Sequence, residues 1–184
     1  MESITRKKIV AFTKTYNHAF RNGRLKHAGR VREYALMLAK KENADRDIVE
    51  IAALLHNIGY AVKSYGHPPL DSARISGLFL KDVLSEGMAK RVAECIRHHR
   101  AIDKEPESVE AKIIAAADSL AFLEDKGMQF FVYKLSRGDI KGMRKRISRI
   151  MGKIKLESAR RIAAPLFEES ARRWRVQKRK IGND

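Results

Sequence analysis

The sequence contains six histidines, and five of them fall at the ends of expected helices or on their apolar faces. These five are His27, His56, His67, His98 and His99. Imidazole binds zinc, iron, nickel and similar cations through one ring nitrogen, while the other donates to a supporting acceptor. A single histidine on an apolar face is usually a hydrogen-bonded core residue. Five spread over separate helices favour a metal cluster over five unrelated structural side chains.

A carboxylate in the middle of the apolar segment IIAAADSLAF indicates the same chemistry. Asp118 shares a helical face with Ile114 and Phe122, where an isolated charge would be strongly unfavourable. It must therefore bind a cation or pair with one. Two interpretations stay open: a metal ligand, or a buried salt bridge to an arginine such as Arg30 or Arg97. We favour the first, because buried ion pairs are weak stabilisers.

Helical periodicity dominates the chain and must position these side chains. Residues 27–41, for example, place His27, Val31, Tyr34 and Leu38 on one face. A second helix is expected to start at Asp45 or Asp47 and to run through IVEIAALLHN, with Gly59 at the favoured position after the helix end. A turn at 66–69 should precede a third helix, from Asp71 or Ser72 to about Leu84. Further helices are expected over 88–100, from Ser108 to near Lys126, and over 128–153 and 156–179. No alternating β pattern and no internal repeat occurs, so the expected fold class is all-α.

Five phrases follow one another in a specific order: LKHAGRVREYALMLAKK, IAALLHNIGY, GHPPLDSARISGLFL, CIRHHR and AKIIAAADSLAFL. This ordered set resembles the HD superfamily of metal-dependent phosphohydrolases, over roughly residues 25 to 125. The resemblance implies a compact HD-type helical bundle. The C-terminal residues lie outside the resemblance, and their helical spacing predicts additional basic helices. We expect a basic helical segment at 1–24, a metal-binding core at 25–126 and a basic extension at 127–184, packed together as one globular domain.

The resemblance also implies a ligand set. His27, His56, Asn57 and Asp118 match the first metal site, and His56, Asn57 and Asp118 match the catalytic positions. His67 with His98 or His99 matches the second metal site of members that have additional histidines. Helical geometry puts His99 on the buried stripe of its helix and His98 on the flank, and the choice between them stays open. The implied cofactor is one or two divalent ions of Mn, Fe, Co, Ni or Zn, with Mg also compatible.

Asn57 departs from the family, in which this position is an aspartate that typically bridges both metals. Asparagine keeps one carbonyl oxygen but loses a negative charge, so it should hold a divalent ion more weakly. The lysine that follows the glycine in the family is also absent, since Tyr60 follows Gly59. Three explanations stay open: one metal or reduced activity, a protein that binds a phosphate compound without cleaving it, or a laboratory substitution that traps a ligand.

Phosphate chemistry needs cationic side chains near the metal. Arg97 and Arg100 flank the histidine pair, Arg30 lies one turn after His27, and Lys63 follows the HNIG turn. Each alone is more often a solvated surface charge. As a group around the expected site they become candidate substrate-binding residues.

The net charge of +17 is unevenly distributed. Residues 1–26 carry seven Lys/Arg against one Glu, residues 27–136 carry sixteen of each sign, and residues 137–180 carry sixteen Lys/Arg against four acids. The basic ends are either helices with solvated cationic faces or a surface that captures nucleotide or nucleic acid. Trp174 is the only aromatic residue among the last basic residues, so base stacking is weakly supported.

Composition limits the remaining possibilities. No apolar run approaches the ~20 residues of a membrane span, no signal-peptide core is recognised, and Cys95 is the single cysteine, so we expect a cytoplasmic protein. The expected function is hydrolysis of a nucleotide or related phosphate ester, as a phosphomonoesterase or phosphodiesterase. The alternatives are an HD-type nuclease on single-stranded nucleic acid, bound through the basic C-terminal helices, and a catalytically impaired phosphate-binding module. The oligomeric state stays open.

Overall fold

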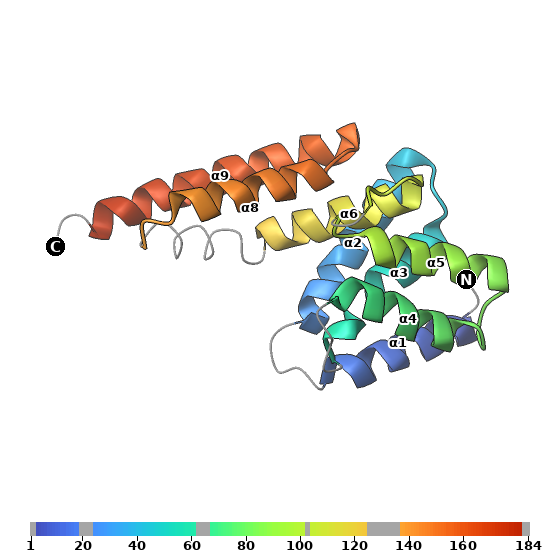
Figure 1. The fold of residues 1–184 in the computed structure, drawn as a ribbon. Helices are drawn as coiled ribbons and strands as arrows, with labels where there is room; N and C mark the ends of the chain where they lie inside the picture. The colour runs from blue at the N-terminus through green and yellow to red at the C-terminus, as the bar shows by residue number, and fades with distance from the viewer. Residues whose placement is uncertain (1–2, 19–23, 62–66, 102–103, 125–136, 182–184) are drawn as a thin grey trace.

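The computed structural model describes residues 3–18, 24–61, 67–101, 104–124 and 137–181. Within these ranges the chain forms helices and no strand, which confirms the all-α class (Figure 1). The elements are α1 (Ser3–His18), α2 (Arg24–Glu42), α3 (Arg46–Leu55), the short 3-10 helix η1 (Ile58–Ala61), α4 (Pro68–Leu80), α5 (Glu86–His98), α6 (Val109–Phe122), α8 (Ile140–Lys153) and α9 (Glu157–Ile181).

Two apolar helices, α3 and α6, form the centre of the core. Every residue from Ile48 to Leu55 is buried, as is most of α6. Helices α2 and α5 both pack against α3 and α6, and α4 packs against α5. The run of alanines at 115–117 is fully buried, and its small side chains permit close helix packing. These two central helices carry His56, which is fully buried, and Asp118, whose side chain is 17% exposed.

Side-chain caps start both central helices where the sequence predicts. Asp45 accepts hydrogen bonds from the backbone N–H groups of Asp47 and Ile48 at the start of α3. Ser108 accepts one from Ala111 at the start of α6. These bonds satisfy N–H groups that have no partner inside the helix. The caps fix where α3 and α6 begin, and hence where His56 and Asp118 lie along them.

The turn after α3 corrects two predictions. Helix α3 ends at Leu55 and η1 follows, so Gly59 is not the residue that terminates the helix. Helix α4 begins at Pro68 rather than at Asp71 or Ser72, because proline suits the first turn of a helix. The buried Ser72 hydroxyl instead joins the two elements: it accepts from the Gly59 N–H and donates to the Pro68 carbonyl, each at 2.8 Å.

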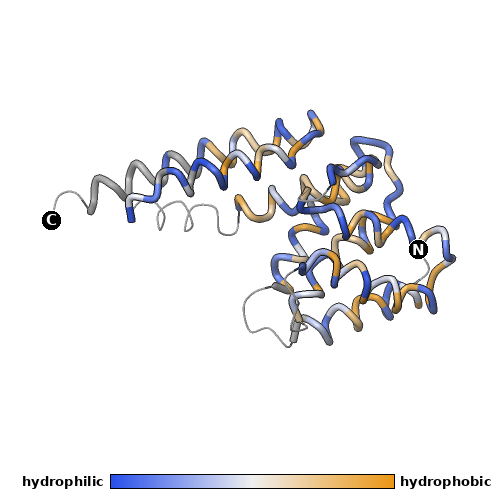
Figure 2. Tube along the Cα trace, viewed as in Figure 1, coloured by the Kyte–Doolittle hydropathy of each residue, from blue (hydrophilic) through white to orange (hydrophobic). Residues whose placement is uncertain are grey.

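The basic C-terminal helices α8 and α9 extend away from the bundle formed by α1 to α6 (Figure 1). Their base is anchored by apolar side chains, with Ile150, Ile154, Ala159 and Ala163 buried, and both helices contact α6. Hydrophilic and hydrophobic positions alternate along α8 and the first half of α9 (Figure 2). Helix α8 starts at Ile140, and part of the helix expected from residue 128 lies outside the described residues.

Among the described residues, no helix combines the length and the apolar character that crossing a bilayer requires.

Candidate metal centre

Three elements bring together three side chains that can ligate a metal. His27 lies on α2, His56 caps the end of α3, and Asp118 lies on α6. One potential ligand atom from each falls within 4.8 Å of the others. His27 Nε2 donates to Asp118 Oδ1 at 3.1 Å, and His56 Nε2 lies 3.7 Å from the same oxygen. Two imidazoles and a carboxylate suit a divalent first-row transition metal, so these residues fit the implied ion.

The orientation of two histidines is set by the backbone. His56 Nδ1 donates to the Ala53 carbonyl at 2.7 Å, and His99 Nδ1 donates to the Ile96 carbonyl at 2.6 Å. A carbonyl can only accept, so Nδ1 carries the hydrogen and Nε2 keeps its lone pair in the neutral ring. This is the arrangement in which an imidazole can bind a metal through Nε2.

His99, rather than His98, lies against the cluster. Its ring meets the His56 ring edge-on, with centroids 5.1 Å apart. Burial, reinforced by His56, lowers the pKa of His99 to about 3, so the ring is neutral at physiological pH. His98 is also buried, but its Nε2 lies 3.1 Å from Glu94 Oε1 on its own helix.

The second set of expected metal ligands is not assembled in the described part of the chain. His67 is exposed at the start of α4, and His98 is directed to Glu94. Neither belongs to the group of converging ligand atoms. A two-metal centre that uses His67 with His98 or His99 therefore stays a prediction from the family resemblance.

Asn57 lies beside the cluster and is half-buried. Its amide nitrogen is 2.6 Å from His56 Nε2, so the amide donates to the lone pair of that ring. Rotation of the amide by half a turn would direct its carbonyl oxygen toward the same side. Coordination through that oxygen would add a ligand without adding a negative charge.

The cation that pairs with Asp118 is a lysine from the C-terminal extension. Lys153 Nζ lies 2.5 Å from Asp118 Oδ2. The alternative interpretation named an arginine such as Arg30 or Arg97 as the partner of Asp118, and in the structure the paired cation is Lys153 instead. Burial alone would raise the pKa of Asp118, but the Lys153 ammonium, the hydrogen bond from His27 and the nearby imidazole of His56 outweigh it and hold the pKa well below its usual value. Asp118 is therefore a carboxylate.

The four predicted substrate-binding cations have different positions. Arg30 pairs with Glu124, which also accepts from Tyr34, and Arg97 is exposed. Arg100 is half-buried and donates to the Tyr60 hydroxyl at 3.1 Å. Lys63 lies outside the described residues.

Sequence reasoning missed two cations on α8. Arg146 lies over the Phe122 ring, 4.5 Å from its centroid. Burial lowers its pKa, while the nearby Asp118 carboxylate acts in the opposite direction and Arg100 reinforces the lowering. The second cation is Lys153. The sequence does carry a pattern that could have indicated both: Arg146, Ile150 and Lys153 are spaced by four and three residues, so the two cations share the helix face that carries the buried isoleucines.

A family model, the HD domain, matches residues 24–123. The chain therefore belongs to the HD-domain family, which confirms the resemblance. Within the matched region, His27, His56 and Asp118 form a candidate site for a divalent metal. The finer division at residues 24 and 126 stays a prediction.

Solved structures with the same fold cover nearly the whole chain. A predicted HD superfamily hydrolase from an uncultured Thermotogales bacterium has a TM-score of 0.71 and 21% identity, over 97% of this chain and 92% of that one. Bacillus subtilis YpgQ has a TM-score of 0.73 and 22% identity, over 96% and 95%. YpgQ in complex with ADP has a TM-score of 0.70 and 22% identity, over 96% of each chain.

One curated relative is a tRNA (cytidine(56)-2'-O)-methyltransferase of Thermoplasma volcanium. It is 30% identical over an alignment of 113 residues, which covers 57% of this chain and 33% of that protein. The chain thus spans about a third of the length of this relative.

Proposed function

We propose that this protein is a metal-dependent phosphohydrolase that acts on a nucleotide or a related phosphate ester. One observation carries the proposal: ligand atoms of His27, His56 and Asp118, from three different elements, converge within 4.8 Å. Burial, the hydrogen bonds of the imidazoles and the ionised state of Asp118 all suit this use.

Each side chain has a definite part in this proposal. His27, His56 and Asp118 hold the ion, and the Asn57 carbonyl is a further donor. A divalent ion held there would lower the pKa of a bound water and neutralise charge that develops on the phosphate. Arg100, Arg146 and Lys153 supply positive charge that orients an anionic phosphoryl group.

The choice of a nucleotide rests on two supports. A structural neighbour, YpgQ, has been solved in complex with ADP. In this chain the cations next to the candidate centre include two arginines, whose planar guanidinium groups match phosphate geometry. A nucleotide carries several phosphate oxygens within reach of such groups.

Activity of the purified protein tests the proposal. We would assay a panel of nucleoside mono-, di- and triphosphates with Mn²⁺, Co²⁺, Ni²⁺ or Mg²⁺, on the wild type, Asn57→Asp and His27→Ala. We expect metal-dependent release of a phosphate product, an increase of about tenfold or more in Asn57→Asp, and loss in His27→Ala. Lys155→Met, an exposed lysine paired with Glu105, serves as the matched control. Ligand binding without product, even in Asn57→Asp, would instead identify a phosphate-binding module.

A second candidate is a nuclease on single-stranded nucleic acid. Its support is the cationic character of α8 and α9 together with the match to a tRNA-modifying enzyme. Neutralising the six Arg/Lys in 172–180 should then weaken binding of a single-stranded oligonucleotide and lower its salt dependence, by about 0.7 in the log–log slope for each phosphate that the protein no longer neutralises. Fluorescence anisotropy across a salt series measures both, and binding unaffected by these changes would exclude this candidate.

A further inference from the structure

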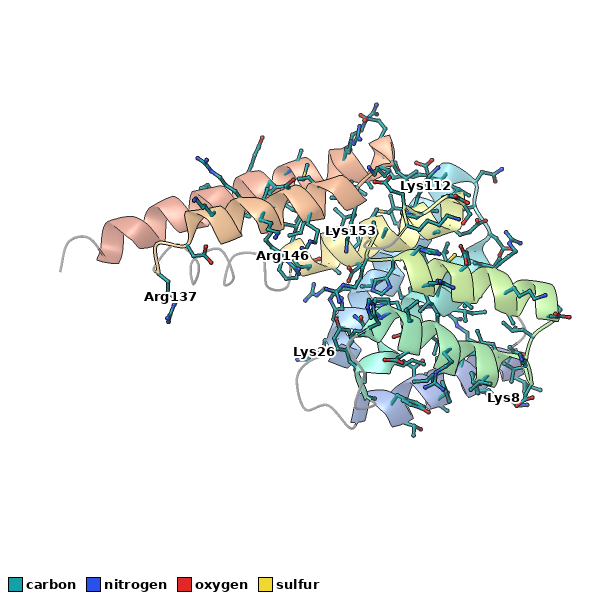
Figure 3. All side chains as sticks on the ribbon, in the orientation of Figure 1. Lys8, Lys26, Lys112, Arg137, Arg146 and Lys153 are labelled. Carbon is teal, nitrogen blue, oxygen red and sulfur yellow. The ribbon has the colours of Figure 1, made fainter. Side chains whose placement is uncertain are left out.

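The packing of α8 against α6 determines the position of the Lys153 side chain. It is the last residue of α8, is 8% exposed, and lies between two buried isoleucines, Ile150 and Ile154. These anchors hold the end of α8 against α6, and Lys153 and Arg146 both extend from α8 toward that helix (Figure 3). Arg137, near the start of α8, extends away from the bundle (Figure 3).

The two oxygens of Asp118 have different neighbours. Oδ1 faces the imidazoles of His27 and His56, at 3.1 and 3.7 Å. Oδ2 accepts from Lys153 Nζ at 2.5 Å. Lysine and a metal ion therefore do not compete for the same oxygen, and both can be present together.

The balance of charge around this carboxylate is unusual for a divalent metal site. Among the described residues of the cluster, Asp118 carries the only negative charge, and the Lys153 ammonium cancels it. The Asn57 amide is neutral and adds no negative charge. A divalent ion would thus bring two uncompensated charges into a largely buried site that also lies near Arg146. A doubly charged phosphate group is the anion that would restore neutrality.

We propose that Lys153 makes metal binding by this protein depend on a phosphate-bearing ligand, so that ion and phosphate bind together. This inference rests on the metal ligands and substrate class of the proposed function. Because coupling between two ligands is reciprocal, each should raise the affinity of the other by the same factor.

Isothermal titration calorimetry with Mn²⁺ tests the coupling. The phosphate mimic is phenylphosphonate, whose phosphorus–carbon bond is not a substrate for ester hydrolysis. In the wild type we expect saturating phenylphosphonate to lower the Mn²⁺ dissociation constant at least about fivefold. Lys153→Met should bind Mn²⁺ more tightly than the wild type without phenylphosphonate and gain less than about twofold from it. Lys155→Met should couple like the wild type, because Lys155 pairs with Glu105 away from Asp118.

Asn57→Asp changes the net charge around Asp118 without removing its partner Lys153. This variant tests the coupling if Lys153→Met does not fold. The added carboxylate should also tighten Mn²⁺ binding alone and reduce the gain from phenylphosphonate. An equal Mn²⁺ affinity of the wild type with and without phenylphosphonate, no Mn²⁺ binding in either case, or full coupling retained in both variants would overturn the inference. Calorimetry of this kind does not measure turnover, so coupling without hydrolysis of any nucleotide would defeat the proposed function alone.

Discussion

At the scale of residues, one local arrangement recurs in the candidate centre. His56 and His99 each follow the end of an α-helix and donate from Nδ1 to the carbonyl three residues earlier. The carbonyls at a helix end have no partner within the helix, so they are available to fix an imidazole. The carbonyl at the helix end thus orients the imidazole and leaves Nε2 able to bind a metal. No carboxylate is needed to accept the hydrogen of Nδ1.

Asp118 should be essential to stability as well as to metal binding. Asp118→Asn removes the carboxylate with which Lys153 pairs among the described residues, and it leaves a side chain that is only 10% exposed without that counter-charge. We expect a loss of about 3 kcal/mol in the free energy of unfolding, measured by urea denaturation. Asp82→Asn, at an exposed position after α4, should change this energy by less than about 0.5 kcal/mol. Equal small effects of the two substitutions would contradict a structural role for the ion pair.

At the scale of elements, the close approach of η1 to α4 holds the turn that carries His56 and Asn57. A Cβ atom at Gly59 would lie 2.4 Å from the Pro68 carbonyl oxygen and 2.5 Å from the Ser72 nitrogen. Both are backbone atoms and cannot move aside as a flexible side chain could. Position 59 therefore requires glycine because there is no room for a side chain, and not because the residue ends a helix.

Gly59→Ala should therefore be costly. We expect a loss of about 2–3 kcal/mol in unfolding free energy, because the added methyl group overpacks a backbone contact. Gly77→Ala in α4 is the matched control, since nothing lies within 4 Å of its added Cβ and alanine favours the helix. That variant should be stabilised by about 0.5–1 kcal/mol. Thermal unfolding followed by circular dichroism compares the two, and a neutral Gly59→Ala would show that the elements separate at little cost.

A buried carboxylate on α3 joins that helix to two others. Glu50 on α3 is 4% exposed and accepts from Arg6 on α1 at 2.5 Å and from Arg32 on α2 at 2.7 Å. This pairing explains how the basic N-terminal helix is held on a charge-balanced bundle. The rest of its basic residues remain largely on the surface.

At the scale of the whole molecule, the C-terminal extension contributes a side chain next to the candidate metal centre of the bundle. Asp118 comes from the central helix α6, whereas its cation comes from α8. The extension is therefore more than a basic surface.

The core around α5 excludes solvent, as its cysteine shows. Cys95 is 1% exposed, and burial raises the pKa of its thiol to about 12.

Cys95 should report opening of the whole bundle. The thiolate is the reactive form, and at pH 8 a thiol with a pKa near 12 is almost fully protonated. We expect no reaction with Ellman's reagent over an hour in the native protein and complete reaction in guanidinium chloride. The modified fraction should follow the unfolding curve measured by circular dichroism. Rapid reaction of the native protein would mean that α5 opens locally.

Local patterns in the sequence determined the helices, the caps at Asp45 and Ser108, and the ordered histidines and aspartate that indicate the family. Periodicity and capping depend on neighbours a few residues apart, so the sequence displays them directly. Tertiary structure alone decided that His99 and not His98 meets His56, that Gly59 is needed for a close contact, and that Lys153 neutralises Asp118. These outcomes depend on packing between elements: the contacts of Asp118 with His27 and Lys153 span 91 and 35 residues of chain. Periodicity assigns a side chain to a face of its helix, but only the packed helices determine which residue that face meets.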